Sequence, residues 1–167
     1  MKILIQIVLI TTLLVVVIYE VRAQIHGPKL DQLELDKQFL GTWKAVNGNE
    51  ITTIKCKLFY NGIETYFKTE KEGKIVVENK LLLGYDKKLD KLIECGIGSD
   101  QECIEVYVAW FTSENVMEEM MLEDLPNPDK AKFKEIFELK SPDIFTLTSL
   151  QNSKIIETLT FNLTHAK

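Results

Sequence analysis

Three glutamates interrupt stretches of sequence that are otherwise apolar. Each has an apolar residue two positions before it and two after it: Glu118 between Val116 and Met120, Glu135 between Phe133 and Phe137, and Glu157 between Ile155 and Leu159. If alternate side chains point into a β-sheet core, these carboxylates lie against apolar walls. A buried charge is costly without a partner, so we expect a ligand amine or a lysine to meet them. The alternative is a bulge or register shift that turns them to solvent.

The remaining chemistry-bearing residues give little support for catalysis. The only histidines, His26 and His165, lie near the ends of the chain, so a Ser–His or Cys–His pair would have no internal base. Neither C-x-x-C nor His-x-x-x-His spacing occurs. His26 could offer nitrogen ligands to Cu(II) after processing, but the favoured interpretation is a frayed end with an incidental histidine. We expect no catalytic residue, no metal and no cofactor.

Aromatic residues supply the apolar part of a candidate pocket. Most of the strand aromatics are expected in the core, and a few are expected to line a cavity. The candidate ligand-binding residues are therefore Tyr60, Phe67, Tyr107, Glu118, Phe133, Glu135 and Glu157.

The first 23 residues predict export. Lys2 precedes an apolar run from Ile3 to Ile18, and Val21-Arg22-Ala23 has short side chains where a signal peptidase cuts. The alternative is an uncleaved anchor, for which the run is slightly short. Cleavage leaves residues 24–167, which we expect to form one domain, secreted or, in a bacterium, periplasmic.

Charge excludes some partners. The predicted signal contains Lys2, Arg22 and Glu20, so the 20 basic and 25 acidic residues of the chain become 18 and 24, with a net charge of −6. No arginine remains, and the lysines are interspersed with glutamates. Such a surface is a poor partner for nucleic acid or anionic membrane. Membrane contact is expected only through the signal before cleavage, and no oligomeric state is assigned.

Three cysteines, at positions 56, 95 and 103, suit one disulfide and one free thiol in an exported protein. Three pairings are possible. We favour Cys95 with Cys103, because the glycine-bearing segment between them is typical of a hairpin loop. Cys56, at period two with Ile54 and Leu58, is expected to be a small buried apolar residue.

Turn residues recur every eight to twelve positions, a spacing typical of all-β domains. Turns are expected around Gly48, at Asn61-Gly62, at Glu72-Gly73, from Asp86 to Lys88, and at Asn152-Ser153. Leu30 to Phe39 is expected to be a short helical turn. Residues 127–139 fit a capped helix with a proline in its first turn, but their period-two apolar pattern favours a strand.

About eight to ten short strands joined by hairpin-sized loops predict an all-β fold, an antiparallel up-and-down barrel. A sandwich is the alternative. A closed barrel of this size has an interior that side chains fill or that admits one small ligand.

Phe39-Leu40-Gly41-Thr42-Trp43-Lys44 resembles the G-x-W signature of the first strand of lipocalins and other calycins. The resemblance implies that Gly41 and Trp43 are structural, with the tryptophan closing one end of the barrel. The chain departs from the family by lacking the mid-chain Thr-Asp-Tyr motif and the late arginine. Segments around Gly84-Tyr85-Asp86 and Ser141-Pro142-Asp143 are similar to an uncharacterised group of calycin-like exported proteins.

The resulting expectation is a secreted, lipocalin-like binding and transport protein that carries a small hydrophobic ligand, possibly with an amine, inside its barrel. One alternative is an interaction or inhibitor protein with a filled barrel and recognition loops. A weaker alternative is an enzyme that uses paired carboxylates. Asn162-Leu163-Thr164 is an N-glycosylation sequon, relevant if the source is a eukaryote.

Overall fold

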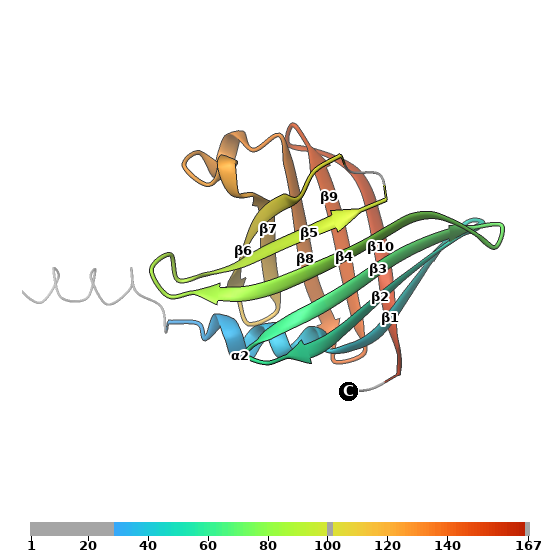
Figure 1. Cartoon of the computed structure of the whole chain (residues 1–167), viewed down its shortest axis with the longest axis horizontal. Helices are drawn as coiled ribbons and strands as arrows, with labels where there is room; N and C mark the ends of the chain where they lie inside the picture. Colours follow the sequence, from blue (N-terminus) through green and yellow to red (C-terminus); the bar gives the residue numbers. More distant parts are fainter. Residues whose placement is uncertain (1–28, 100–101, 166–167) are drawn as a thin grey trace, which may run out of the picture.

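Ten antiparallel strands close into a barrel in the computed structural model, which describes residues 29–99 and 102–165 (Figure 1). Each strand pairs with the next along the chain, and β10 returns to pair with β1. The predicted all-β up-and-down barrel is confirmed, with ten strands. They are β1 Gly41–Asn47, β2 Glu50–Phe59, β3 Gly62–Lys71, β4 Lys74–Asp86, β5 Lys91–Gly98, β6 Glu105–Ser113, β7 Val116–Met121, β8 Phe133–Ser141, β9 Ile144–Gln151 and β10 Lys154–His165.

Tight turns join most of the strands where the sequence predicts them. Asn152 and Ser153, between β9 and β10, both have positive φ, 49° and 62°. Glu72 and Gly73, between β3 and β4, have φ of 53° and 76°. Positive φ at both central residues is typical of two-residue hairpin turns, because the twist of such a turn matches the twist of the two strands that it joins. These turns set the pairing register, and with it the side chains that face inward.

A short helical segment closes one end of the barrel. The helix α2 (Gln32–Asp36) begins at Asp31, whose Oδ1 accepts a hydrogen bond from Glu34 N at 3.1 Å, and continues into the 3₁₀ turn η1 (Lys37–Phe39). The expected helical turn is confirmed. Gln32 anchors the helix to β6: its Nε2 donates to Phe111 O at 3.3 Å, and its Oε1 accepts from Phe111 N at 2.6 Å.

Aromatic packing fills this closed end. Trp43 is 1% exposed, and its Nε1 donates to Phe39 O at 2.7 Å. Its ring meets Phe145 edge-on at 4.9 Å, and Phe145 stacks on Phe161 at 4.7 Å. Gly41, just before Trp43, has a φ of 131°, which only glycine adopts readily. The structure therefore places Gly41 and Trp43 at the closed end, where the sequence analysis assigned them structural roles.

The connection between β7 and β8 covers the outside of the barrel. It contains two 3₁₀ turns, η2 (Leu122–Asp124) and η3 (Pro128–Lys130). A second apolar cluster forms here from Val108, Met120 and Ala131, with Trp110, Leu122 and Leu125 packed against it. The proline-bearing turn and the strand β8 that follows it are both present, so the preferred strand prediction for this segment is confirmed.

The cysteine pairing prediction is wrong in this structure, where Cys56, Cys95 and Cys103 are all free thiols. β5 continues three residues beyond Cys95, to Gly98, and Cys95 lies opposite Val106 in the β5–β6 pair. The register thus places Val106 rather than Cys103 across from Cys95.

The predicted signal peptide lies outside the described residues. Within the described residues, no helix has the length and apolar character needed to cross a membrane.

Candidate ligand-binding cavity

A cavity of about 430 Å³ occupies the barrel interior above the closed end. Phe39 and Trp43 form part of its lining at that end, and all ten strands contribute side chains to the lining. The apolar wall consists of Phe39, Trp43, Ile54, Ile63, Phe67, Leu81, Leu83, Met117, Phe133, Phe137, Phe145, Leu147 and Leu159. The interior is therefore only partly filled by side chains.

Carboxylates form a belt along one side of this cavity, because the strand register aligns them. Glu119 on β7 lies opposite Glu135 on β8, which lies opposite Ser149 on β9. Ser149 in turn lies opposite Glu157 on β10. Ser149 Oγ donates to Glu135 Oε1 at 3.0 Å, and Asn47 Nδ2 donates to Glu157 Oε1 at 3.2 Å.

The described lining of the cavity contains several acidic residues and no basic one. Six of its described residues carry carboxyl groups, and none is Lys, Arg or His: Asp36, Glu94, Glu105, Glu119, Glu135 and Glu157. Asp36, Glu94 and Glu119 are almost fully buried, with exposures of 3%, 7% and 7%. Water therefore does little to stabilise their charged forms.

Burial raises the carboxyl pKa values in the cavity. Desolvation, with the charges of Asp36 and Glu135 second, raises the pKa of Glu94 to about 8. Desolvation also raises the pKa of Asp36 to about 7. The pKa of Glu135 is raised to about 7 by desolvation, partly offset by the Ser149 hydroxyl. Desolvation and the neighbouring carboxylates raise the pKa of Glu119 well above its ordinary value.

The opposite wall is neutral. Cys56 Sγ lies 3.7 Å from Thr65 Oγ1, and burial raises the pKa of the Cys56 thiol to about 12. A thiol with that pKa stays protonated near neutral pH and is a poor nucleophile. Farther along this wall, Asn79 Oδ1 is buried and accepts no hydrogen bond from the part of the chain that the structure describes.

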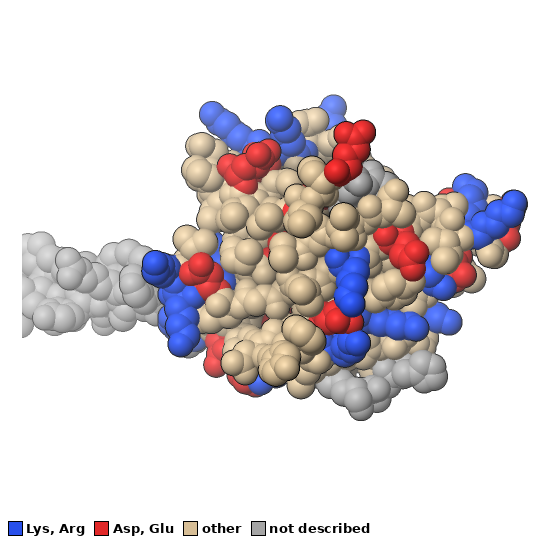
Figure 2. All heavy atoms as spheres, viewed as in Figure 1, with Lys and Arg blue, Asp and Glu red and all other residues tan. Residues whose placement is uncertain are grey.

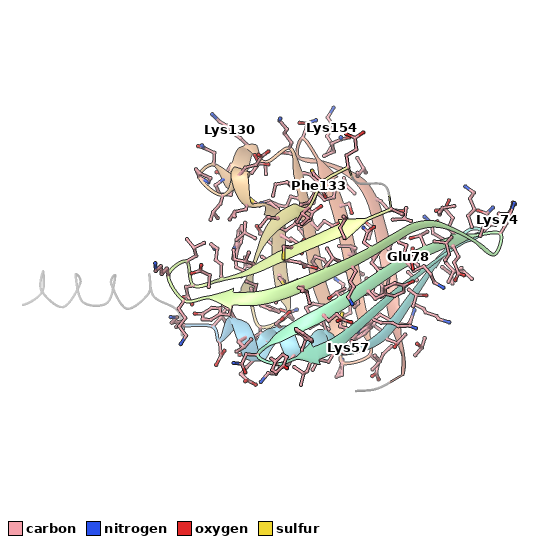
Figure 3. The ribbon with its side chains drawn as sticks, viewed as in Figure 1. Lys57, Lys74, Glu78, Lys130, Phe133 and Lys154 are labelled. Atoms are coloured by element: carbon pink, nitrogen blue, oxygen red, sulfur yellow. The ribbon has the colours of Figure 1, made fainter. Side chains whose placement is uncertain are left out.

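Five of the seven predicted ligand-binding residues line the cavity: Phe67, Tyr107, Phe133, Glu135 and Glu157. Tyr107 donates its hydroxyl to Glu105 Oε2, and burial together with that hydrogen bond raises its pKa. In Figure 3, Phe133 lies within the outline of the barrel, whereas Lys130, Lys154 and Lys74 extend away from its edge.

The other two predicted residues lie elsewhere. Tyr60 is 90% exposed at the β2–β3 turn, with a positive φ of 54°. Glu118 points to the outer face of β7, where its Oε2 lies 3.1 Å from Lys134 Nζ. The predicted inward orientation of Glu118 is wrong. Side chains alternate along β7, and those that face the cavity are Met117 and Glu119.

The sequence analysis missed three of the most buried acids: Asp36, Glu94 and Glu119. The spacing of Gln32 and Asp36 could have indicated that Asp36 is buried, because residues four apart share one face of a helix and both are buried here. Glu94 alternates with Leu92, a core residue, which is a period-two signal.

No family model, curated protein or solved structure matches this chain. Among the described residues, no group of three or more His, Cys, Asp or Glu side chains is arranged to hold a metal ion. The predicted bridge residues Cys95 and Cys103 are exposed, and so is Asn162 of the sequon, on β10.

The outer surface is of mixed charge. Figure 2 shows lysines and acidic side chains interspersed over one face, with no broad region of a single sign. Several lysines are paired with acids, as where Lys57 Nζ and Lys80 Nζ lie 2.9 Å and 3.2 Å from the two carboxylate oxygens of Glu64. Acidic groups without a basic residue beside them in the lining are thus a property of the described part of the cavity rather than of this face.

Proposed function

We propose that this protein binds a small organic cation with an apolar body inside its barrel. The observation that carries the proposal is the cavity lining, which has six carboxyl groups and no basic side chain among its described residues. A cation from outside would supply the missing counter-charge in a site of low polarity, where ion pairing is strong. A ligand carboxylate would be repelled by the same groups.

The apolar wall and the volume of the cavity determine which apolar body the ligand can have. A volume of about 430 Å³ has room for roughly 14 water molecules at ~30 Å³ each. An organic molecule with a similar number of heavy atoms therefore fits. Phe67, Phe133 and Phe137 offer aromatic faces on which a ring can pack, and aromatic faces also attract cations.

The cavity favours a carrier over a protein that acts only through its loops, since a filled barrel would leave no such space. The resemblance to lipocalins supports the same proposal, and the predicted signal peptide supports action outside the cytoplasm. An exported carrier of this kind would sequester or transport its ligand.

Carboxylate-dependent catalysis is a second candidate, favoured by one specific observation. Glu119 and Glu135 are opposed inside the cavity and both have raised pKa values, which is how acid–base pairs are arranged in enzymes. The two candidates differ in outcome: a carrier returns its ligand unchanged, whereas an enzyme releases a product that chromatography of the incubated mixture detects.

Isothermal titration calorimetry with a series of indoles of different charge tests the proposal. Tryptamine is cationic, tryptophol is neutral and of nearly the same shape, and indole-3-acetate is anionic. At pH 8 we expect tryptamine to bind at least ten-fold more tightly than tryptophol, and indole-3-acetate not to bind. Equal binding of all three, or preferred binding of the anion, would overturn the proposal.

A further inference from the structure

Asp36 occupies an unusual position for an acidic residue. It is the last residue of α2, it is 3% exposed, and it lines the cavity at the closed end. Gln32, one turn earlier, fixes the helix through its two hydrogen bonds to the backbone of Phe111. The Asp36 carboxyl is therefore held at the bottom of the cavity by a short, anchored helix.

The side chain of Asp36 lacks the partner that its burial requires. Its Oδ2 is buried and has no hydrogen-bond partner among the described residues. A buried polar atom in that state costs free energy, and native structures rarely retain one without a reason. Since no described residue donates a hydrogen bond to Asp36 Oδ2, the partner is expected to come from the ligand.

Among the described residues that line the cavity with Asp36, the titratable groups include no basic side chain. The groups facing the cavity are Cys56 from β2, Glu94 from β5, Glu105 and Tyr107 from β6, Glu119 from β7, Glu135 from β8 and Glu157 from β10. Glu94 and Glu119 lie near enough for the Asp36 charge to raise their pKa values. The electrostatic potential at the closed end is accordingly negative whenever these groups ionise.

We propose that Asp36 anchors the cationic group of the ligand at the closed end of the barrel, and that binding releases the proton which Asp36 holds in the empty cavity. This inference rests on the proposed function and adds the orientation of the ligand and its coupling to protons. The amine enters first and the apolar body follows toward the open end. The ligand ammonium keeps its own proton; the Asp36 carboxylic acid loses its proton to the solvent and becomes the carboxylate of the ion pair.

Proton release makes binding dependent on pH. Burial raises the pKa of Asp36 to about 7 in the empty cavity. The bound ammonium would return that pKa toward its ordinary value of 3.8, so the affinity for the cation rises as pH increases between these limits. For one proton, the affinity for tryptamine increases roughly 20-fold from pH 5.5 to pH 7.5.

Asp36→Asn and Asp31→Asn form a matched pair of variants. Asparagine keeps the shape of Asp36 without its charge, and at Asp31, the exposed N-cap of the same helix, it caps as well as aspartate. Calorimetry with tryptamine at pH 6 in phosphate and in MES, buffers of different ionisation enthalpy, counts the released protons. Tryptophol serves as the neutral probe.

The wild-type chain and Asp31→Asn should release close to one proton per tryptamine bound. Asp36→Asn should bind tryptamine at least ten-fold more weakly, release less than half a proton, and bind tryptophol unchanged. Its midpoint of thermal unfolding without ligand should be equal to or above that of the wild type, because a desolvated acid is removed.

Wild-type tryptamine affinity in Asp36→Asn would overturn the role of Asp36 alone. A lower unfolding midpoint with equal loss of both probes would show a structural role instead. No preference of the wild type for tryptamine would overturn the proposed function as well.

Discussion

Glu119 and Glu135 oppose each other across β7 and β8, and both side chains face the cavity of the barrel. Like charges directly opposite on neighbouring strands destabilise a sheet, and this pair also lacks full hydration. The pKa of each carboxyl is raised, so near neutral pH the fold relieves part of the repulsion by retaining protons. A bound cation would relieve the repulsion between the two carboxylates without these protons.

The ligand-free protein should be more stable in mild acid than in mild base. Asp36, Glu94 and Glu135 have folded-state pKa values of about 7, 8 and 7, above their ordinary values of 3.8, 4.5 and 4.5. The folded state thus binds more protons than the unfolded state from about pH 4.5 to pH 8, and stability falls as pH rises through that window. Thermal unfolding followed by circular dichroism should show a midpoint several degrees lower at pH 8.5 than at pH 5.

Glu119→Gln is the control for this pH dependence, since glutamine removes one titrating group and keeps the shape of the side chain. Its unfolding midpoint should vary less between pH 5 and pH 8.5 than that of the wild type. A midpoint that rises with pH in the wild type would contradict the account of the cavity acids.

Glu135→Gln and Glu118→Gln should separate the two faces of the β7–β8 pair. Glu135 lies in the cavity, whereas Glu118 pairs with Lys134 outside it, with side chains 26% and 22% exposed. We expect Glu135→Gln to weaken tryptamine binding at least five-fold at pH 8. Glu118→Gln should leave binding within two-fold of the wild type and cost up to about 1 kcal/mol of stability. Unchanged binding in Glu135→Gln would argue against an amine beside this residue.

Gly62→Ala and Gly84→Ala should have opposite effects on stability. A Cβ at Gly62 would lie 2.2 Å from the carbonyl oxygen of Leu83, whereas a Cβ at Gly84 meets no atom within 4 Å. Because the obstacle at Gly62 is backbone of the paired strand, Gly62→Ala should cost about 2 kcal/mol or more. Gly84→Ala should be neutral or slightly stabilising. Urea unfolding measures both, and equal midpoints would show that the β3–β4 register is wrong.

Thiol accessibility should follow the orientation of the three cysteines. Cys95 and Cys103 are exposed, whereas Cys56 lines the cavity and its pKa is raised to about 12 by burial. Alkylation of the native protein with iodoacetamide near pH 8, followed by mass spectrometry of peptides, should modify Cys95 and Cys103. Cys56 should react only after unfolding. Resistance of both Cys95 and Cys103 without a reductant would indicate the bridge that the structure lacks.

The fold could be predicted from the sequence because its turns are marked locally. Each of the turns Asn152-Ser153 and Glu72-Gly73 contains one residue type that tolerates positive φ, Asn152 or Gly73, and each reverses one strand onto the next. The helical segment before Trp43 was likewise predictable. Closure by β10 onto β1 is a long-range pairing with no local marker, so the sequence predicts eight to ten strands rather than one number.

The site was less predictable because β7 is apolar on both faces. Met120 packs on the outside under the β7–β8 connection, while Met117 lines the cavity. In the run from Val116 to Met121, either the even-numbered or the odd-numbered residues could therefore face the cavity. The sequence favours Glu118, whereas the structure has Glu119 there. A bulge in the β6–β7 pair, between Phe111 and Ser113, adds to the ambiguity.

Native mass spectrometry of the folded protein with an equimolar mixture of tryptamine, tryptophol and indole-3-acetate at pH 8 tests the central claim most directly. The three probes compete for one cavity at one pH, so the mass of the ligand released from the isolated complex on collisional activation reports which charge the barrel accepts. The account predicts a single adduct with the mass of tryptamine, lost in Asp36→Asn. An adduct of indole-3-acetate, or an equal mixture of the three, would contradict it.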